Sequence, residues 1–448
     1  MHAAFAPPTD DAVPVHLVDV EAWESGLFDD IPFAKALGFG GRAGEVVKTP
    51  TESGALGAVL FGLGEGDDAL ALAALSAQLG EGVFDIVSAP ERWRTEWSAA
   101  GWADGAYRFT RYLNEEAPPP RLVVREDGHA LSSEADAVAL VRDLVNTPAQ
   151  DMGPDAIETA VRGVGAPHGA EIEATVGDDL LAANYPLIHA VGRAGPVAPR
   201  LVELSWGRED ARELAIVGKG VAFDTGGLNL KTGGYMRDMK KDMGGAAHAI
   251  ALAKLVMDAG LDVRLKLYIP TVENSISAAS FRPGDILSSR KGLTVEIDNT
   301  DAEGRLILAD ALTRACEGEP DLLIDFATLT GAARVALGAD LAPFYTDDEA
   351  LAGALQAGSA DAGDPAWRMP LWDPYLSDLK SSVADIVNSG GRFAGSITAA
   401  LFLKKFVDAP SWAHFDIWAW RLGKYGRPAG GAATGLRAAW AAIRDRYA

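Results

Sequence analysis

The sequence predicts an α/β protein with two parts: a small N-terminal α/β domain over residues 1–130 and a larger α/β domain over residues 131–448. Three observations lead to this prediction. A chain of 448 residues exceeds the size of one typical core. A proline-punctuated loop, Asn114–Pro120, separates the early segments from the rest of the chain. Beyond it, strand-like and helix-like segments alternate, which favours a central, mostly parallel, mixed sheet flanked by helices.

The elements of the first part mix short apolar runs with helical patterns. A helix expected at 132–145, just beyond the proposed boundary, should stop near Asn146-Thr147-Pro148, because a residue before proline avoids the helical conformation. The expected strands are 59–61, 83–87 and 121–125, and the expected helices are 67–79, 91–111 and 132–145.

The elements of the second part follow the alternation expected of an open α/β sheet. Such sheets bind their ligands at the carboxyl ends of the strands, so the loops that leave these strands are where functional residues are sought. The expected strands are 214–217, 265–269, 293–297 and 322–326, and the expected helices are 245–259 and 304–316.

Composition limits the class of partner. The chain is 48% hydrophobic and 23% charged, as in ordinary globular proteins, and its net charge of −23 argues against nucleic acid or an anionic membrane as a main partner. The single cysteine, Cys316, excludes an intrachain disulfide framework and fits a reducing compartment. We find no signal-peptide pattern and no apolar run near the roughly 18 residues of a membrane span. We therefore expect a cytoplasmic protein.

Residues 299–306, Asn-Thr-Asp-Ala-Glu-Gly-Arg-Leu, are the most informative stretch. They follow an expected strand, and their alternation can aim Asp301, Glu303 and Arg305 into one pocket. Two carboxylates so close repel each other unless a cation lies between them, which indicates a metal site. The alternative is a helix-start capping box, Thr300 to Glu303, without any chemistry.

A second stretch, 217–231, also follows an expected strand and is rich in glycine, which permits close approach of a ligand. It is not a Walker A phosphate loop, because Lys219 is followed by glycine rather than by Ser or Thr. Farther along, Asp238 and Asp242 lie four residues apart. Singly, each aspartate fits a helix cap or a surface charge. Together with Asp301 and Glu303, the carboxylates are numerous enough to bind two divalent ions.

These motifs resemble those of the leucyl (cytosol) aminopeptidase family. The family signature Asn-Thr-Asp-Ala-Glu-Gly-Arg stands at 299–305, and its Gly-Lys-Gly-x-x-Phe-Asp-[Ser/Thr]-Gly-Gly segment stands at 218–227. The resemblance extends from about Arg142 to the C-terminus, whereas residues 1–130 resemble the family only loosely. Further matching segments, in the family's order, are 146–148, 282–285, 327–332 and 412–416.

The resemblance implies a metal-dependent aminopeptidase, in which a water activated between two divalent ions (Zn or Mn) hydrolyses the N-terminal peptide bond of short peptides. It also implies a homohexamer and makes residues 131–448 the catalytic, dinuclear-metal domain. Arg305 would hold a bicarbonate ion that acts as general base, and Lys231 would polarise the substrate carbonyl. The implied metal ligands are Lys219, Asp224, Asp242, Asp301 and Glu303, and the implied substrate-binding residues are Met239, Thr328, Leu329 and Gly331.

The implied roles place opposite demands on the two lysines. Lys219 must be neutral to bind a metal ion, and lowering a lysine pKa from about 10.4 to below 7 costs about 4–5 kcal/mol, which an adjacent dication can supply. Lys231 must remain an ammonium, which neighbouring carboxylates favour. Asp238 has no implied role, and His248 and His414 are expected to be buried structural residues.

The substrate pocket is expected to depart from the family pattern. Met239 would give a soft apolar pocket for Leu or Met, although it could equally be a core residue. Where the family commonly has Ile-Ala-Gly, this chain has Ile417-Trp418-Ala419-Trp420, and the two indoles would narrow or reshape the pocket.

Two other classes of function remain open at this point. A two-metal phosphoryl hydrolase would share the carboxylate cluster. A non-catalytic binding or architectural relative is the other alternative, and the net charge argues against nucleic acid as its partner.

Overall fold

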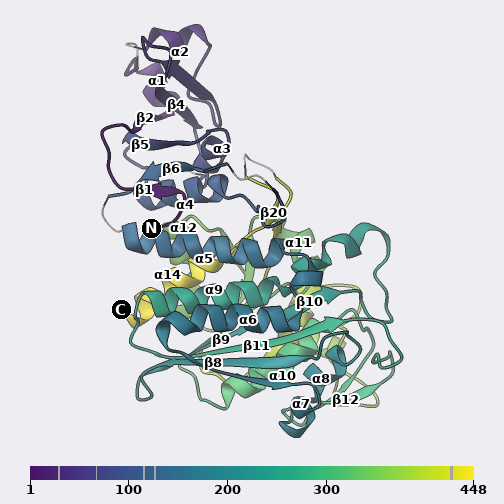
Figure 1. Cartoon of the computed structure of the whole chain (residues 1–448). Helices are drawn as coiled ribbons and strands as arrows, with labels where there is room; N and C mark the ends of the chain where they lie inside the picture. Colours follow the sequence, from purple (N-terminus) through teal and green to yellow (C-terminus); the bar gives the residue numbers. More distant parts are fainter. Residues whose placement is uncertain (29–30, 67, 115–116, 126–127, 424–426) are drawn as a thin grey trace. The chain divides into compact units, whose positions relative to one another are not determined.

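The structure is a computed structural model that describes residues 1–28, 31–66, 68–114, 117–125, 128–423 and 427–448. The chain divides into two compact units (Figure 1). The first comprises Met1–Ala139 with Arg421–Gly430, and the second comprises Leu140–Trp420 with Gly431–Ala448. The boundary expected near residue 130 falls inside α5 (Gly128–Asn146), the helix that runs through this division.

The first unit contains a sheet of strand order β1-β6-β5-β2-β4-β3, in which only the β3–β4 pair is antiparallel. Its core gathers Leu17, Phe61, Phe84 and the fully buried Trp102, whose indole N–H donates to the carbonyl of Pro120. The strands are β1 (Phe5–Ala6), β2 (Val13–Asp19), β3 (Val46–Pro50), β4 (Leu56–Gly64), β5 (Gly82–Ser88) and β6 (Pro120–Val123). The helices are α1 (Val20–Glu24), α2 (Pro32–Ala36), α3 (Leu72–Ser76) and α4 (Thr95–Ala106).

Two helices of this unit are shorter than the sequence predicts. The segment 67–79 forms only α3, because the Asp68 carboxylate caps the amide of Leu70 in a turn before the helix; residue 67 lies outside the described residues. The segment 91–111 forms only α4, which the extended backbone at Arg94 and Tyr107 bounds at either end. Apolar and helix-forming residues therefore continue past the helices into turns.

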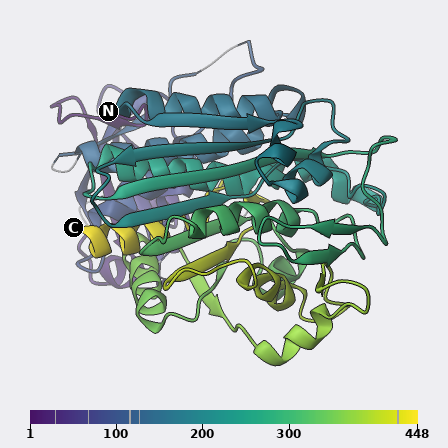
Figure 2. The same ribbon diagram turned by 90° about the horizontal axis from the view of Figure 1, so that it is seen from below.

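The second unit is built on a mixed, mostly parallel sheet of order β16-β15-β18-β14-β9-β11-β8-β7, with β10 also paired to β11 (Figure 2). The pairs β15–β18, β11–β8 and β7–β8 are antiparallel. This confirms the predicted fold class. The strands are β7 (Glu171–Val176), β8 (Arg200–Gly207), β9 (Glu213–Gly218), β10 (Gly220–Asp224), β11 (Arg264–Asn274), β14 (Leu322–Ala327), β15 (Ala342–Tyr345), β16 (Ala366–Met369) and β18 (Trp412–Asp416).

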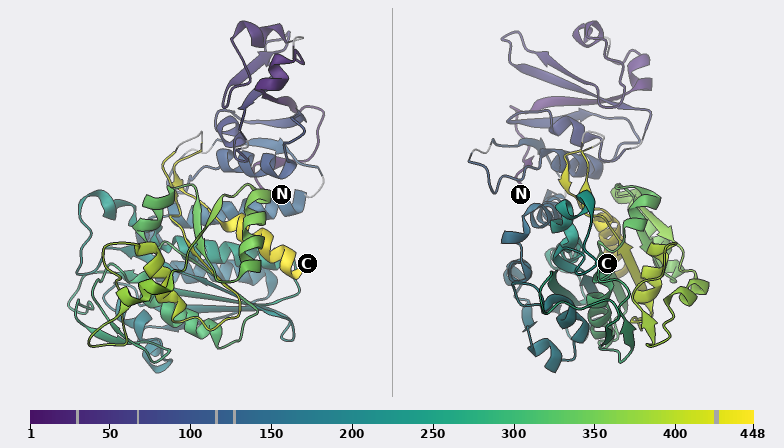
Figure 3. Two further views of the ribbon diagram at one scale, coloured as in Figure 1. Left: turned by 180° about the vertical axis from the view of Figure 1, so that it is seen from behind. Right: turned by 90° about the vertical axis from the view of Figure 1, so that its right-hand side faces the viewer.

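Helices cover both faces of this sheet (Figures 1 and 3). On one face, α6 (Pro154–Gly165) and α9 (Gly244–Asp258) pack on β8, β9, β11 and β14. On the other, α8 (Pro186–Gly192) and α10 (Gly304–Cys316) pack on β9 and β11. The central strands β9 and β14 are buried along their whole length and are mostly apolar, because helices cover both of their faces.

The remaining elements complete the second unit, and no helix among the residues that the structure describes could span a membrane. A small sheet of order β12-β13-β17 contains the strand expected at 293–297. The bounds are η1 (Ala149–Asp151), η2 (Ala166–His168), α7 (Asp179–Ala182), η3 (Gly233–Met243), β12 (Ile286–Ser288), β13 (Thr294–Glu296), α11 (Gly331–Leu337), α12 (Glu349–Ala362), η4 (Asp373–Leu379), β17 (Ile386–Val387), α13 (Gly395–Lys404), β19 (Trp420–Arg421), β20 (Gly430–Gly431) and α14 (Leu436–Tyr447).

The start of α10 corrects the capping-box alternative. The N-cap residue is Glu303, without a side-chain capping bond, and the helix begins at Gly304. The Thr300 hydroxyl instead donates to the carbonyl of Gly226, 2.6 Å away. Thr300 therefore joins two loops rather than starting the helix.

Candidate metal centre

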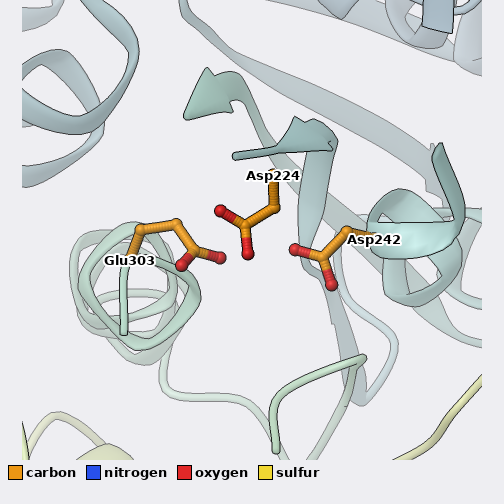
Figure 4. Close-up of side chains that lie close together, drawn as sticks. All are labelled: Asp224, Asp242 and Glu303. Atoms are coloured by element: carbon orange, nitrogen blue, oxygen red, sulfur yellow. The ribbon is translucent and has the colours of Figure 1, made fainter. Parts of the chain in front are cut away.

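Three buried carboxylates meet at the carboxyl edge of the sheet. Asp224 ends β10, Asp242 lies on η3 just before α9, and Glu303 precedes α10. Figure 4 shows the three side chains pointing toward one another from these separate elements. One oxygen from each lies within 4.8 Å of the others, and all three residues are at most 2% exposed. Sequence positions up to 79 residues apart therefore form one acidic cluster.

Two lysines form ion pairs with the carboxylates of the acidic cluster. The Lys219 ammonium lies 2.7 Å from Asp242 Oδ2 and 2.9 Å from Glu303 Oε1. The Lys231 ammonium lies 2.7 Å from Asp224 Oδ2 and also contacts Asp301. The fourth predicted carboxylate, Asp301, is thus at the margin of the cluster, with 32% of its side chain exposed.

Burial and mutual repulsion shift the pKa values of these groups. Burial, followed by the charge of Asp224, raises the pKa of Glu303 to about 8 and that of Asp301 to about 6. Burial opposes the ammonium of Lys219, but the Asp242 and Glu303 carboxylates outweigh it and raise the lysine pKa. Burial likewise opposes the ammonium of Lys231, and Asp224 and its neighbours outweigh it. The neighbouring carboxylates therefore favour the charged form of both lysines.

The donor set fits divalent cations. Glu303 Oε2 is buried and accepts no hydrogen bond from the described residues. This oxygen is therefore available to bind a cation. A buried charge left in that condition is costly unless a cation binds it. Carboxylate oxygens suit hard divalent ions, and one neutral amine can join them when the ion displaces its proton.

Two glycines allow the segments that form this site to approach each other closely. A Cβ on Gly304 would come within 2.7 Å of Lys219 Nζ and even closer to the lysine Cε, so a side chain there would displace the amine. Gly226 adopts a φ of +87°, and a Cβ there would lie 2.5 Å from the carbonyl of Asn229. These two positions of the sequence motifs therefore require glycine for steric reasons.

Asn274, to which the sequence motifs assign no role, holds together the end of β10 and the loop that precedes α10. The side-chain amide of Asn274, at the end of β11, donates to Asp224 Oδ1 at 2.8 Å and to the carbonyl of Thr300 at 3.1 Å. Asn229 accepts from the amide of Thr300 at 2.8 Å. Asn274 is fully buried, so it orients Asp224 as a rigid support. No spacing in the sequence signals this contact.

Arg305 is buried behind the acidic cluster. Its Nη1 donates to the carbonyl of Asn388 at 2.7 Å, whereas its buried Nε has no hydrogen-bond acceptor among the described residues. Burial lowers the pKa of Arg305 to about 10. The Nε–H of this guanidinium is therefore available to donate to an anion.

The predicted substrate-binding residues lie on two segments beside the centre. Met239 is half-buried on η3, three residues before Asp242. The Thr328 hydroxyl donates to Asp242 Oδ1 or to its carbonyl, each 2.9 Å away. Leu329 is half-buried, and Gly331 begins α11. Thr328 therefore also supports a metal-ligand candidate.

The two histidines are structural in this fold, as expected. His248 is fully buried, and its ring nitrogens contact the carbonyl of Gly244 and the amide of Thr434. His414 is fully buried on β18, and its Nδ1 bonds to Asp325 at 2.6 Å. Neither is in the acidic cluster.

An α/β sheet with a buried carboxylate cluster at the carboxyl ends of its strands is typical of metal-dependent hydrolases. Comparison with known proteins specifies the family. The catalytic domain of the cytosol aminopeptidase family matches residues 139–439, and the N-terminal domain of M17 aminopeptidases matches residues 18–125. The chain therefore belongs to the cytosol aminopeptidase family. It is a metal-dependent aminopeptidase, as the sequence motifs predicted.

Individual relatives agree with this assignment. A probable cytosol aminopeptidase of Xanthomonas axonopodis is 38% identical over 88% of this chain and 77% of its own length. The crystal structure of the Coxiella burnetii cytosol aminopeptidase is 42% identical, with a TM-score of 0.93 over 98% of both chains. A bottromycin maturation enzyme in complex with Mn is 33% identical, with a TM-score of 0.86 over 98% of this chain and 100% of its own. The likeness thus includes the N-terminal unit, which the sequence motifs reached only loosely.

Proposed function

We propose that this chain removes the N-terminal residue of short peptides with two divalent ions held by Lys219, Asp224, Asp242, Asp301 and Glu303. The observation that carries this proposal is the buried convergence of Asp224, Asp242 and Glu303, with a Glu303 oxygen that no described residue satisfies. The ions, when bound, supply Lewis-acid polarisation and lower the pKa of water. Zn and Mn are the proposed metals, and the Mn complex of the related maturation enzyme supports the latter.

The remaining roles belong to two cations. Lys231 is proposed to polarise the substrate carbonyl, since Asp224 and Asp301 hold it as an ammonium at the margin of the cluster. Arg305 is proposed to hold a bicarbonate ion as general base, and its buried, unpaired Nε supplies the donor. Met239, Thr328, Leu329 and Gly331 are proposed to contact the substrate's first side chain.

We also propose a cytoplasmic homohexamer. Exposed large apolar side chains in the second unit, among them Trp367, Trp372 and Phe393, favour burial against further copies of the chain. The relatives' name, cytosol aminopeptidase, supports the compartment. Light scattering of the purified chain tests the assembly: a mass near the 47.0 kDa of one chain would contradict it.

Hydrolysis of amino-acid anilides by the purified chain tests the site. We expect turnover of leucine anilide that full chelation abolishes and added Mn²⁺ or Zn²⁺ restores. A generic phosphate ester should not be turned over, which separates this function from a two-metal phosphoryl hydrolase. Turnover that survives complete metal removal would overturn the proposal.

A further inference from the structure

Arg334 is a half-buried cation without a carboxylate partner among the described residues. It lies on α11, and its guanidinium carbon is 4.9 Å from the ring centroid of Trp418. Other partly buried arginines of this chain are paired: Arg314 with Glu203, and Arg290 with Glu317. The indole face stabilises the charge of Arg334 but accepts none of its N–H bonds. The guanidinium is thus held in place with its donors free.

This cation lies beside the segment proposed to contact the substrate. Arg334 follows Gly331 by three residues, so the two share one face of α11. Thr330, Arg334 and Trp418 line the same cavity, whose volume is about 10 Å³. A cavity of that size holds about one water, or one oxygen of similar size.

The Trp418 segment also reaches the metal centre. Ala419, with a φ of 55°, lies against Gly244, where an added Cβ would come within 2.3 Å of the alanine Cβ. Gly244 is two residues beyond Asp242, and the same added Cβ would contact Thr328 at 3.1 Å. The arginine–indole pair therefore continues the wall that Thr328 and Ala419 form beside the centre.

The one carboxylate that lines this cavity is already satisfied. Asp416 accepts from the amide of Leu329 at 3.1 Å, from the amide of Thr330 at 3.0 Å, and from the Thr330 hydroxyl at 2.6 Å. It is only 1% exposed, so it neither pairs with Arg334 nor presents a charge to a ligand. Arg334 is therefore the cation of this wall that has no carboxylate partner among the described residues.

We propose that Arg334, held against Trp418, binds the side-chain carboxylate of an acidic N-terminal residue, so that peptides beginning with Asp or Glu are preferred over their amide counterparts. This inference rests on the proposed function, since it concerns the same site. A guanidinium can donate two parallel bonds to a carboxylate. An amide of the same shape would leave the charge uncompensated, and a site built for a polar group discriminates strongly against an analogue that lacks it.

Paired anilides of glutamate and glutamine test the inference, because they differ in charge and not in shape. For the wild-type enzyme, we expect kcat/KM for the glutamate anilide to exceed that for the glutamine anilide by about tenfold or more. Arg334→Gln should reduce this ratio to near one, and Arg334→Lys should retain part of it. Raising the salt concentration should lower the wild-type ratio.

Arg208→Gln is the matched control. It also removes one positive charge, but from an exposed loop after β8, where Arg208 pairs with Asp210 and Asp262. Leucine anilide reports folding and the metal centre, and Arg334→Gln should hydrolyse it within about threefold of the wild-type rate. Competition against leucine anilide by free glutamate and free glutamine gives a binding readout, in which wild type should favour glutamate and Arg334→Gln should not.

The outcomes separate the two proposals. If leucine anilide is hydrolysed but the glutamate preference is absent, or is unchanged in Arg334→Gln, the inference about Arg334 is wrong and the proposed function stands. If Arg208→Gln lowers the ratio as much as Arg334→Gln, the general charge of the molecule causes it and the inference is again wrong. If no anilide is hydrolysed with added metal, the proposed function fails and this inference with it.

Discussion

Two buried carboxylates on one short stretch of chain, Glu303 and Asp310, have different surroundings. Glu303, at the start of α10, faces Asp224 and Asp242, and its Oε2 has no donor among the described residues. Asp310, two turns along the same helix, accepts the amides of Leu187 and Ile188 at 2.8 and 3.4 Å and that of Arg290 at 2.8 Å. Glu303 therefore has no partner other than a cation, whereas Asp310 ties backbone segments to α10.

Titration alone does not distinguish the two groups. Burial raises the pKa of Glu303 to about 8 and that of Asp310 to about 7. The partners distinguish them: backbone donors satisfy Asp310, whereas Glu303 contacts the Lys219 ammonium and faces two other acids. A buried acid is therefore a functional candidate when its neighbours repel it, and a structural one when they donate to it.

The largest expected effect is on the functional side of this contrast. Asp242→Asn should lower turnover of leucine anilide by about a thousandfold, equivalent to about 4 kcal/mol in activation free energy, because a metal-ligand candidate loses its charge. The matched control is Asp238→Asn, four residues earlier on η3, which should retain near-normal turnover. Steady-state kinetics at saturating Mn²⁺ measures both, and near-normal rates for Asp242→Asn would remove it from the site.

The structural side should respond in stability rather than in chemistry. Asp310→Ala should lower the free energy of unfolding by about 3 kcal/mol or more, because three backbone amides lose their acceptor. Urea denaturation measures the loss, and turnover per folded molecule should be preserved. Thr313→Ala is the control on the same helix. Among the described residues, the Thr313 hydroxyl bonds only to the carbonyl of Ala309, so the loss of stability should be much smaller. Equal losses of unfolding free energy in the two variants would show that Asp310 does not hold these backbone segments together.

Metal removal should sharpen the contrast. A cation at a hundred times its dissociation constant stabilises the folded state by about 2.7 kcal/mol. Chelation should therefore lower the unfolding temperature of wild type and of Asp310→Asn by similar amounts, and that of Asp242→Asn much less. Differential scanning calorimetry tests this, and an unchanged response in Asp242→Asn would argue that the ions bind elsewhere.

A separate expected effect is the pH dependence of Asp310. Burial raises its folded pKa to about 7, above the unfolded value of about 3.9. The folded state therefore binds more protons between these values, so the stability that the protonated group contributes is present below pH 4 and is lost as pH rises to about 7. Relative to Asp310→Asn, wild type should lose up to about 1.4 kcal/mol per pH unit in this window. Parallel stability profiles for the two proteins would contradict this.

Local sequence determined much of the site. The bounds of α10 agree with the predicted helix 304–316, because its apolar periodicity is long and regular. The strands at Leu214–Val217 and Leu322–Phe326 lie within β9 and β14, since buried parallel strands read as continuous apolar runs. The two motifs that carry the family resemblance contain Asp224 and Glu303, two of the three residues of the acidic cluster, whereas Asp242 lies outside them.

Tertiary structure decided which residues of distant motifs contact one another. Thr300 matches the capping pattern, yet its hydroxyl bonds to Gly226, which lies 74 positions earlier. Asn274 orients Asp224 across 50 positions, and Arg334 meets Trp418 across the cavity. Spacing reports which side chains share one helix or strand face, because those periods are local. It is silent on contacts between elements, since the packing of the whole sheet and its helices sets them.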